Sequence, residues 1–96
     1  MNITFVKNGN ELCVSLEGRL DTMTAPELES FIIKNCTAVS GLTIDCEKLE
    51  YVSSAGLRVL LSAQKRMNNV MRLINVGELV MEVFEMTGFA DILTIE

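Results

Sequence analysis

The stretch CEKLEYVSSAGLRVLLSAQKRM, residues 46–67, joins an extended segment to a helical one and decides the class of the fold. The apolar run GLTIDCEKL (41–49) leads into it and is typical of a buried central strand. After the pair Ser53-Ser54, apolar residues recur at helical spacing and predict a helix over 54–68. Four of them should pack inward and leave Gln64 outside: Leu57, Leu60, Leu61 and Met67.

The N-terminal segment predicts a β-hairpin. Strands are expected over 2–6 and 11–18, and the second alternates apolar with more polar residues, as a half-buried strand does. Its apolar members are Leu12, Val14 and Leu16. Asn8-Gly9 lies between the two strands and is a strong signal for a tight turn, whose two central residues need positive φ.

A helix is expected over 25–35. Thr24 and Glu27 fit a capping box, in which each side chain accepts a backbone N–H of the helix start. Pro26 is tolerated in the first turn because the N–H that it lacks has no partner there. The inward face of this helix carries Leu28, Phe31 and Ile32.

The C-terminal third predicts one more strand over 70–76 and one more helix over 77–89. Gly88 stands where a left-handed C-terminal cap would end this helix. The inward face of the helix carries Val80, Val83 and Phe84. The last residues, 91–95, are expected to add a short edge strand.

The predicted order of elements is β-β-α-β-α-β-α. Strands that alternate with helices imply right-handed crossovers and a small, mixed, mostly parallel sheet. The opening hairpin adds an antiparallel edge, and the helices should cover mainly one face of the sheet. We therefore expect an α/β fold in a single domain over residues 1–96.

Composition is that of a compact globular domain, with 49% hydrophobic residues and one proline. No apolar run approaches the ~20 residues that span a bilayer, and the first residues do not resemble a signal peptide. A cytoplasmic protein without direct membrane insertion is therefore expected. The three cysteines, Cys13, Cys36 and Cys46, show no CxxC spacing and are predicted to be buried, inert thiols, with a metal site as the minor alternative.

Several kinds of chemistry are not expected. The net charge of −5 argues against nucleic acid as a partner and would suit a basic protein. The chain has no histidine, which excludes a Ser-His-Asp triad and a histidine-bound zinc. Asp21 and Asp45 lie near predicted strand ends, but no nucleophile or phosphate-binding glycine motif accompanies them. We expect neither an enzyme nor a cofactor or metal.

The serine pair therefore needs another explanation. The first turn of a helix leaves N–H groups unpaired and favours an anion, so a phosphoryl group on a serine would be stabilised there. Such a group would add roughly −1.5 to −2 charge at pH 7. The alternative is that Ser53 or Ser54 only caps the helix, which contributes about 1 kcal/mol. Gly56 in the first turn points to close approach of another backbone or to tight packing.

Residues 42–61, LTIDCEKLEYVSSAGLRVLL, resemble the central signature of STAS domains, the family of the bacterial anti-sigma factor antagonists. The likeness is carried by an aspartate after an apolar strand, then by an aromatic and an aliphatic residue, serine, alanine, glycine and leucine: Asp45, Tyr51, Val52, Ser54, Ala55, Gly56 and Leu57. The segments LEGRLDTMTAPEL (16–28) and MTGFADIL (86–93) also resemble the family, so the likeness covers essentially the whole chain.

The resemblance implies an anti-sigma factor antagonist, which in its unmodified form binds the anti-sigma factor, frees the sigma factor and so regulates transcription. A serine/threonine switch kinase that is also an anti-sigma factor would phosphorylate Ser54, and a PP2C-type phosphatase would reverse this. Members often carry aspartate before that serine, whereas this chain carries Ser53. This difference would either weaken recognition by the kinase or make Ser53 a second acceptor. The partner-binding residues implied are Asp21, Thr24, Ser53, Ser54, Ala55, Gly56 and Leu57. Met23 and the side chain of Leu57 are expected to face the core.

Two other functions fit the same fold. STAS domains also serve as accessory subunits of lipid or anion transporters, where the serines would contact a transporter subunit without being phosphorylated. A nucleotide-binding regulatory module is the third alternative, with the helix N-terminus holding a ligand phosphate. Binding of a switch kinase, of a transporter subunit or of a nucleotide would distinguish the three.

Overall fold

The computed structural model, which describes residues 1–96, begins with the expected hairpin. β1 (Asn2–Asn8) pairs antiparallel with β2 (Glu11–Leu20). The turn lies one residue later than predicted, because Asn8 is the last residue of β1 and pairs with Glu11. Gly9, with a φ of 61°, supplies the positive φ of the turn, and Asn10 does not have one. This is the two-residue hairpin turn with glycine at its first central position.

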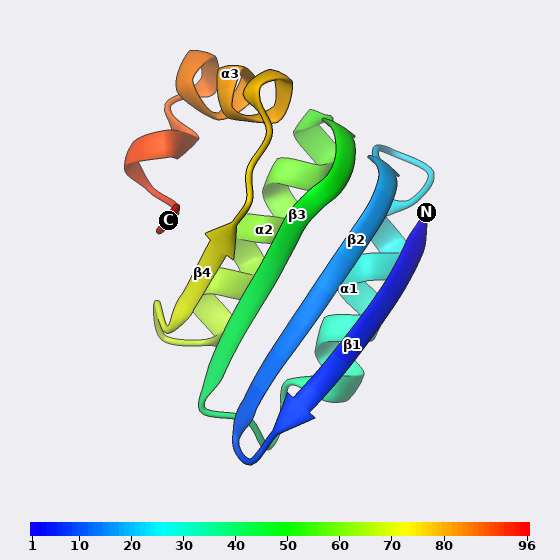
Figure 1. The fold of residues 1–96 in the computed structure, drawn as a ribbon, viewed down its shortest axis with the longest axis vertical. Helices are drawn as coiled ribbons and strands as arrows, with labels where there is room; N and C mark the ends of the chain where they lie inside the picture. Colours follow the sequence, from blue (N-terminus) through cyan, green and yellow to red (C-terminus); the bar gives the residue numbers. More distant parts are fainter.

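The four strands form one sheet in the order β1-β2-β3-β4 (Figure 1). β3 (Gly41–Val52) pairs parallel with β2, and β4 (Met71–Ile74) pairs parallel with β3, so the expected mixed, mostly parallel sheet is confirmed. β3 extends three residues beyond the predicted 41–49 because its second half follows β2 past two register shifts. β4 is shorter than the predicted 70–76.

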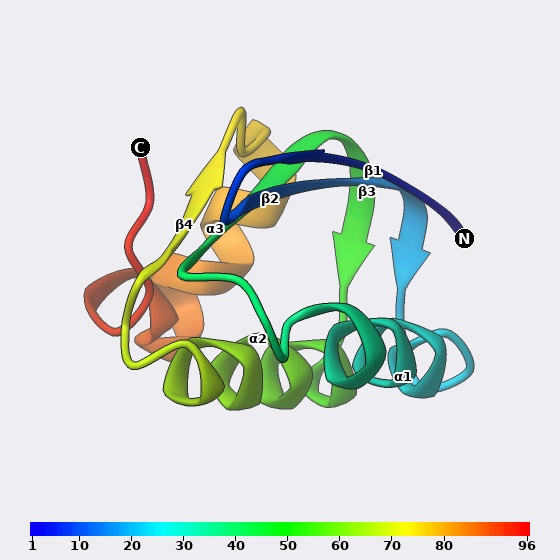
Figure 2. The ribbon, with the colours of Figure 1, turned by 90° about the horizontal axis from the view of Figure 1, so that it is seen from below.

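The three helices are confirmed close to their predicted bounds: α1 (Ala25–Asn35), α2 (Ser54–Arg66) and α3 (Glu78–Thr87). Figure 2 shows α1 and α2 side by side against one face of the sheet. α3 contacts β3 and lies at the end of the sheet where β3 ends (Figure 1). α3 ends at Gly88, whose φ of 82° is the predicted left-handed cap. The opposite face of the sheet has no helix over it.

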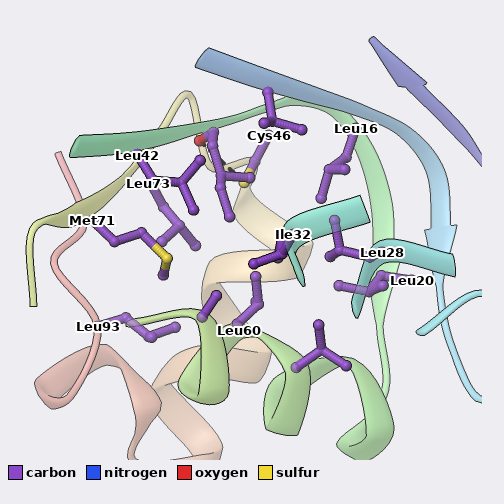
Figure 3. Packing of buried hydrophobic residues seen from close by; sticks show 14 of the residues in the cluster. Leu16, Leu20, Leu28, Ile32, Leu42, Cys46, Leu60, Met71, Leu73 and Leu93 are labelled. Carbon is purple, nitrogen blue, oxygen red and sulfur yellow. Dashed lines mark hydrogen bonds between the residues drawn. The ribbon is translucent and has the colours of Figure 1, made fainter. Parts of the chain in front are cut away.

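The core fills the space between the sheet and the helices (Figure 3). The alternation of β2 is confirmed, since Leu12, Val14 and Leu16 are buried. Phe84 of α3 is the largest fully buried side chain. The uncovered face of the sheet carries small polar or charged side chains that water can solvate, among them Thr4, Ser15, Thr43 and Asp45.

The C-terminal residues do not form the expected edge strand over 91–95. A single turn of 3-10 helix, η1 (Phe89–Asp91), follows Gly88. The chain then meets β4 at one bridge only, between Leu73 and Ile95. The turn of η1 leaves too few extended residues for a longer ladder.

The prediction that Gln64 lies on the outward face of α2 is wrong. Gln64 is buried, with 6% of its surface exposed, and its Nε2 donates a hydrogen bond to the carbonyl oxygen of Ile92 at 2.7 Å. The Oε1 atom has no hydrogen-bond partner. The amide is buried because the C-terminal segment folds back over α2, an event that the periodicity of the helix does not encode.

The cysteines lie as expected in two cases of three. Cys36 and Cys46 are buried, and Cys13 is half-buried on the uncovered face of the sheet. Burial, together with the charge of neighbouring Asp45, raises the pKa of the Cys46 thiol to about 12. Burial also raises the pKa of Cys36, which a nearby Arg66 only partly opposes. These two thiols are therefore held in their neutral, unreactive form.

None of the helices combines the length and the apolar character that a membrane-spanning helix needs.

Candidate functional site

Helix α2 begins at the serine pair, and the two serines take different roles. Ser53 is the N-cap, with an extended backbone (φ −99°, ψ 177°), and its hydroxyl oxygen accepts the N–H of Gly56 at 3.4 Å. Ser54 is the first helical residue and is exposed. Because the Ser53 hydroxyl caps the helix and Ser53 is half-buried, Ser54 is the serine whose hydroxyl is more accessible to a second molecule.

The start of α2 is fixed to the end of β2 at Leu20. The backbone N–H of Ser53 donates to the carbonyl oxygen of Leu20 at 2.9 Å. A Cβ atom added at Gly56 would lie 2.7 Å from Leu20 Cγ and 2.9 Å from its carbonyl oxygen. Close approach to another backbone therefore explains the glycine. Sequence reasoning did not identify Leu20, since an accepting carbonyl leaves no mark in the sequence.

Asp21 and Thr24 form a hydrogen-bonded turn between β2 and α1. Asp21 Oδ1 accepts the N–H groups of Met23 at 3.0 Å and Thr24 at 3.2 Å. The Thr24 hydroxyl donates to the carbonyl of Arg19 at 2.7 Å and accepts the N–H of Asp21 at 2.9 Å. The predicted capping box of Thr24 and Glu27 is wrong, because the Thr24 hydroxyl bonds backward to the end of β2 instead of forward to α1.

The charge of Asp21 is stabilised by this turn. Partial desolvation acts to raise the pKa of the carboxyl. The N–H groups of Thr24 and Met23, the Thr24 hydroxyl and the Arg19 guanidinium outweigh it and lower the pKa below the ordinary value of 3.8. Arg19 Nε lies 3.7 Å from Asp21 Oδ2, and the same guanidinium stacks over the Tyr51 ring at 4.3 Å from its centroid. Asp21, Arg19 and Tyr51 thus form a continuous surface at this end of the sheet.

Replacing Asp21 with alanine should destabilise the fold at neutral pH, because the N–H groups of Met23 and Thr24 would lose their acceptor. A carboxyl whose pKa is lower in the folded state stabilises the fold above its unfolded pKa and loses that contribution as pH falls through the folded pKa. The gap between wild type and Asp21→Ala should therefore close below pH 3.8. Urea unfolding of both proteins from about pH 2.5 to 7 measures this.

A matched control is Asp91→Ala, which removes an exposed carboxyl from η1. At neutral pH it should unfold in urea close to wild type, because it removes no acceptor of a backbone N–H. A gap for Asp21→Ala that persists at the acid end would show that the turn does not depend on the charged carboxyl.

The structure brings the predicted partner-binding residues together at one end of the sheet but divides them by exposure. Ser54 is exposed, whereas Asp21, Thr24, Ser53 and Ala55 are half-buried. Gly56 and Leu57 are buried, and the Leu57 side chain, 4% exposed, belongs to the core as expected of that side chain. These two residues support the surface from below.

Met23 corrects an expectation. It was predicted to face the core, but 86% of its surface is exposed because the Asp21 turn directs residue 23 outward. It therefore adds an apolar side chain to the surface beside the turn.

The first turn of α2 also carries unpaired donors. The N–H groups of Ser54 and Ala55 precede the first intrahelical hydrogen bond, in which Leu57 N–H donates to the Ser53 carbonyl at 2.9 Å. No acidic side chain lies in this turn. The partial positive charge of the helix start is therefore available to an anion beside the Ser54 hydroxyl.

Comparison with known protein families gives a match to the STAS domain over residues 2–96. The chain belongs to the STAS domain family. The resemblance inferred from the serine motif is thereby confirmed, and this STAS domain has the mixed sheet and one-sided helices described above.

Curated relatives and a solved structure agree with this assignment. The chain is 26% identical to the anti-sigma-B factor antagonist of Bacillus subtilis, with 99% of this chain and 90% of that protein covered. It is 33% identical to BtrV of Bordetella bronchiseptica, named as a proposed anti-sigma factor antagonist, over 96% of this chain and 83% of that protein. The phosphorylated form of the Bacillus cell fate determinant SpoIIAA has the same fold, with a TM-score of 0.74 at 18% identity, covering 99% of this chain and 91% of that chain.

Proposed function

We propose that this STAS domain is an anti-sigma factor antagonist that binds an anti-sigma factor serine kinase while Ser54 is unmodified and releases it once Ser54 is phosphorylated. The observation that carries the proposal is the exposed Ser54 hydroxyl at the start of α2, next to a cap already supplied by Ser53. The names of the two curated relatives support the antagonist role. The solved phosphorylated form of SpoIIAA supports phosphorylation as the control.

The position of Ser54 suits a modification that changes binding without changing the fold. Its side chain is exposed, and the core of the domain does not depend on it. The oxygens of a phosphoryl group there would accept hydrogen bonds from the unpaired N–H groups of the first turn. The group would also add roughly −1.5 to −2 charge. A partner seated on this surface would meet both the bulk and the charge.

Ser53 is the poorer acceptor of a phosphoryl group. Phosphorylating its hydroxyl would disturb the bond to Gly56 N–H and change the cap of α2. The Ser54 hydroxyl does not cap the helix. The protein acts in this scheme as substrate and binding module rather than as catalyst, in the cytoplasm, and a PP2C-type phosphatase returns it to the binding form.

The first test is binding by Ser54→Asp, which places a negative charge at the proposed acceptor. Affinity capture from the native cytoplasm with wild type as bait, followed by mass spectrometry, should retrieve the kinase. The purified kinase should then bind Ser54→Asp at least about tenfold more weakly than wild type. Intact mass of wild type recovered from cells should show a phosphate that maps to Ser54.

The matched control is Ser62→Asp, which adds the same charge to an exposed serine further along α2. It should bind the kinase as wild type does. Far-ultraviolet circular dichroism and urea unfolding should show both variants folded. Equal binding of wild type and Ser54→Asp, or capture of transporter subunits by both, would refute the proposed function.

A further inference from the structure

An apolar groove lies beside α3. Leu79 and Met86 project from α3 with 73% and 80% of their surfaces exposed, and Tyr51 at the end of β3 is 38% exposed. With Val83 they line a depression of about 260 Å³. A second depression of about 400 Å³ shares Leu79 with it and continues toward the start of α3. We call this surface, lined by Tyr51, Leu79, Val83 and Met86, the α3 groove.

The rim of the α3 groove is acidic. Glu50 and Glu82 line the first depression, and Glu78 lines the second. All three are exposed. The lining side chain with positive charge is Arg19, and its guanidinium is already stacked on Tyr51 and near Asp21. An occupant must therefore offer apolar side chains flanked by positive charges.

The α3 groove adjoins the Ser54 surface. Tyr51 stands two residues before the cap Ser53, and Arg19 links its ring to the Asp21 turn. Figure 1 places the ends of β2 and β3, the start of α2 and the whole of α3 at the same end of the sheet. One molecule can contact both the serine and the groove.

The spacing of the exposed side chains favours a helical occupant. Leu79 and Met86 are seven residues apart on one face of α3, which corresponds to about 10 Å along the axis. This length matches about two turns of a helix lying alongside. A second copy of this chain is disfavoured, since it would bring its own net charge of −5 to an acidic rim.

We propose that the α3 groove binds a basic amphipathic helix of the partner, in addition to the contact at Ser54. The identity of the partner as the kinase rests on the proposed function. The chemistry of the groove does not, because it follows from the exposed apolar side chains and the carboxylates around them. The contact at Ser54 is controlled by phosphorylation, whereas the groove contact selects the partner by charge and shape.

The test uses two synthetic helical peptides and the isotope-labelled full chain. One peptide carries leucines on one face and arginines beside them, and the other replaces the arginines with glutamates. Titration followed by amide NMR shifts should show saturable binding of the arginine peptide, with shifts centred on Tyr51, Leu79 and Met86. Leu79→Glu should weaken this binding about tenfold.

Ile33→Glu is the matched control, because it makes the same kind of change at a half-exposed apolar residue of another helix, α1. It should bind the arginine peptide as wild type does. Absence of saturable binding, shifts centred elsewhere, or equal binding of the glutamate peptide would overturn the inference. So would concentration-dependent dimers of wild type that Leu79→Glu abolishes, since the occupant would then be a second copy.

The purified kinase separates the two proposals. If Ser54→Asp and Leu79→Glu both weaken kinase binding while Ile33→Glu does not, the proposed function and the groove inference are both supported. If the arginine peptide binds in the groove but the kinase binds wild type and Ser54→Asp equally, the proposed function fails and the groove remains. If the kinase distinguishes Ser54→Asp but binds Leu79→Glu as tightly as wild type, the groove inference fails alone.

Discussion

Gln64→Glu should destabilise the fold by about 3–5 kcal/mol at neutral pH, the cost of leaving a buried charge without a partner. Gln64 donates its Nε2 hydrogen to the Ile92 carbonyl at 2.7 Å. A carboxylate in its place would have no hydrogen to donate, so two acceptor oxygens would face each other at a site that is only 6% exposed. The expected measurement is a large fall in the urea midpoint with little change in the denaturant slope.

The same variant should recover stability in acid relative to wild type. Burial raises the pKa of a carboxyl, and the protonated form can donate to the Ile92 carbonyl as the amide did. For an acid whose folded pKa is raised, the penalty is complete above the folded pKa and disappears as pH falls toward the unfolded value of about 4.3. Urea unfolding of both proteins at several pH values tests this sign.

Gln64→Met is the control for Gln64→Glu. It keeps the length of the side chain, removes the unpaired Oε1 and gives up the bond to Ile92, so its cost should be far smaller and independent of pH. A pH-independent loss in Gln64→Glu equal to that in Gln64→Met would mean that the C-terminal segment moves away from α2 and lets water reach the new group.

Gly56→Ala should lower the free energy of unfolding by about 1–3 kcal/mol, the range for overpacking a core. The added methyl would lie 2.9 Å from a backbone oxygen that cannot rotate away, that of Leu20. Alanine favours a helix over glycine by about 1 kcal/mol, which offsets only part of this cost. The clash should also push the start of α2 from β2 and lengthen the bond from Ser53 N–H to Leu20, which measures 2.9 Å.

The effect of Gly56→Ala is measurable in two ways. Urea unfolding gives the stability, and binding of the partner kinase to the fraction that remains folded reports the displaced Ser54 surface. Gly77→Ala is the control, because a Cβ atom there meets nothing within 4 Å, and it should cost less despite weakening the cap of α3. If Gly56→Ala is no less stable than wild type, the start of α2 does not depend on close contact with Leu20.

The fold could be predicted from local patterns where one face of an element is buried. The alternation of Leu12, Val14 and Leu16 located β2, and the helical spacing of apolar residues located α2 within two residues of its end. Local pattern failed where the partner is distant in the chain. β3 continues through Tyr51 because that residue pairs with Arg19 of β2, and Gln64 is buried because Ile92 reaches it.

In the candidate site, too, only the residues placed by a local pattern could be predicted from the sequence. The place of Ser54 at the start of a helix followed from the helical spacing of the apolar residues after the serine pair. The roles of Leu20, Arg19 and Tyr51 did not, since they depend on how β2 and β3 lie side by side. The Thr24 hydroxyl could either cap α1 or close the turn that precedes it, and the local sequence does not decide between the two. It closes the turn, because it donates to the carbonyl of Arg19.

The order of the strands in the sheet is the order of the strands in the chain. Each new strand is therefore added at the edge left by the one before it, and none has to insert between two strands that are already paired. A chain emerging from the ribosome N-terminus first can build this sheet in the order of its synthesis, beginning with the hairpin, whose loop is the shortest. The last step is the return of the C-terminal segment, when Ile95 reaches Leu73 and Ile92 receives the amide of Gln64.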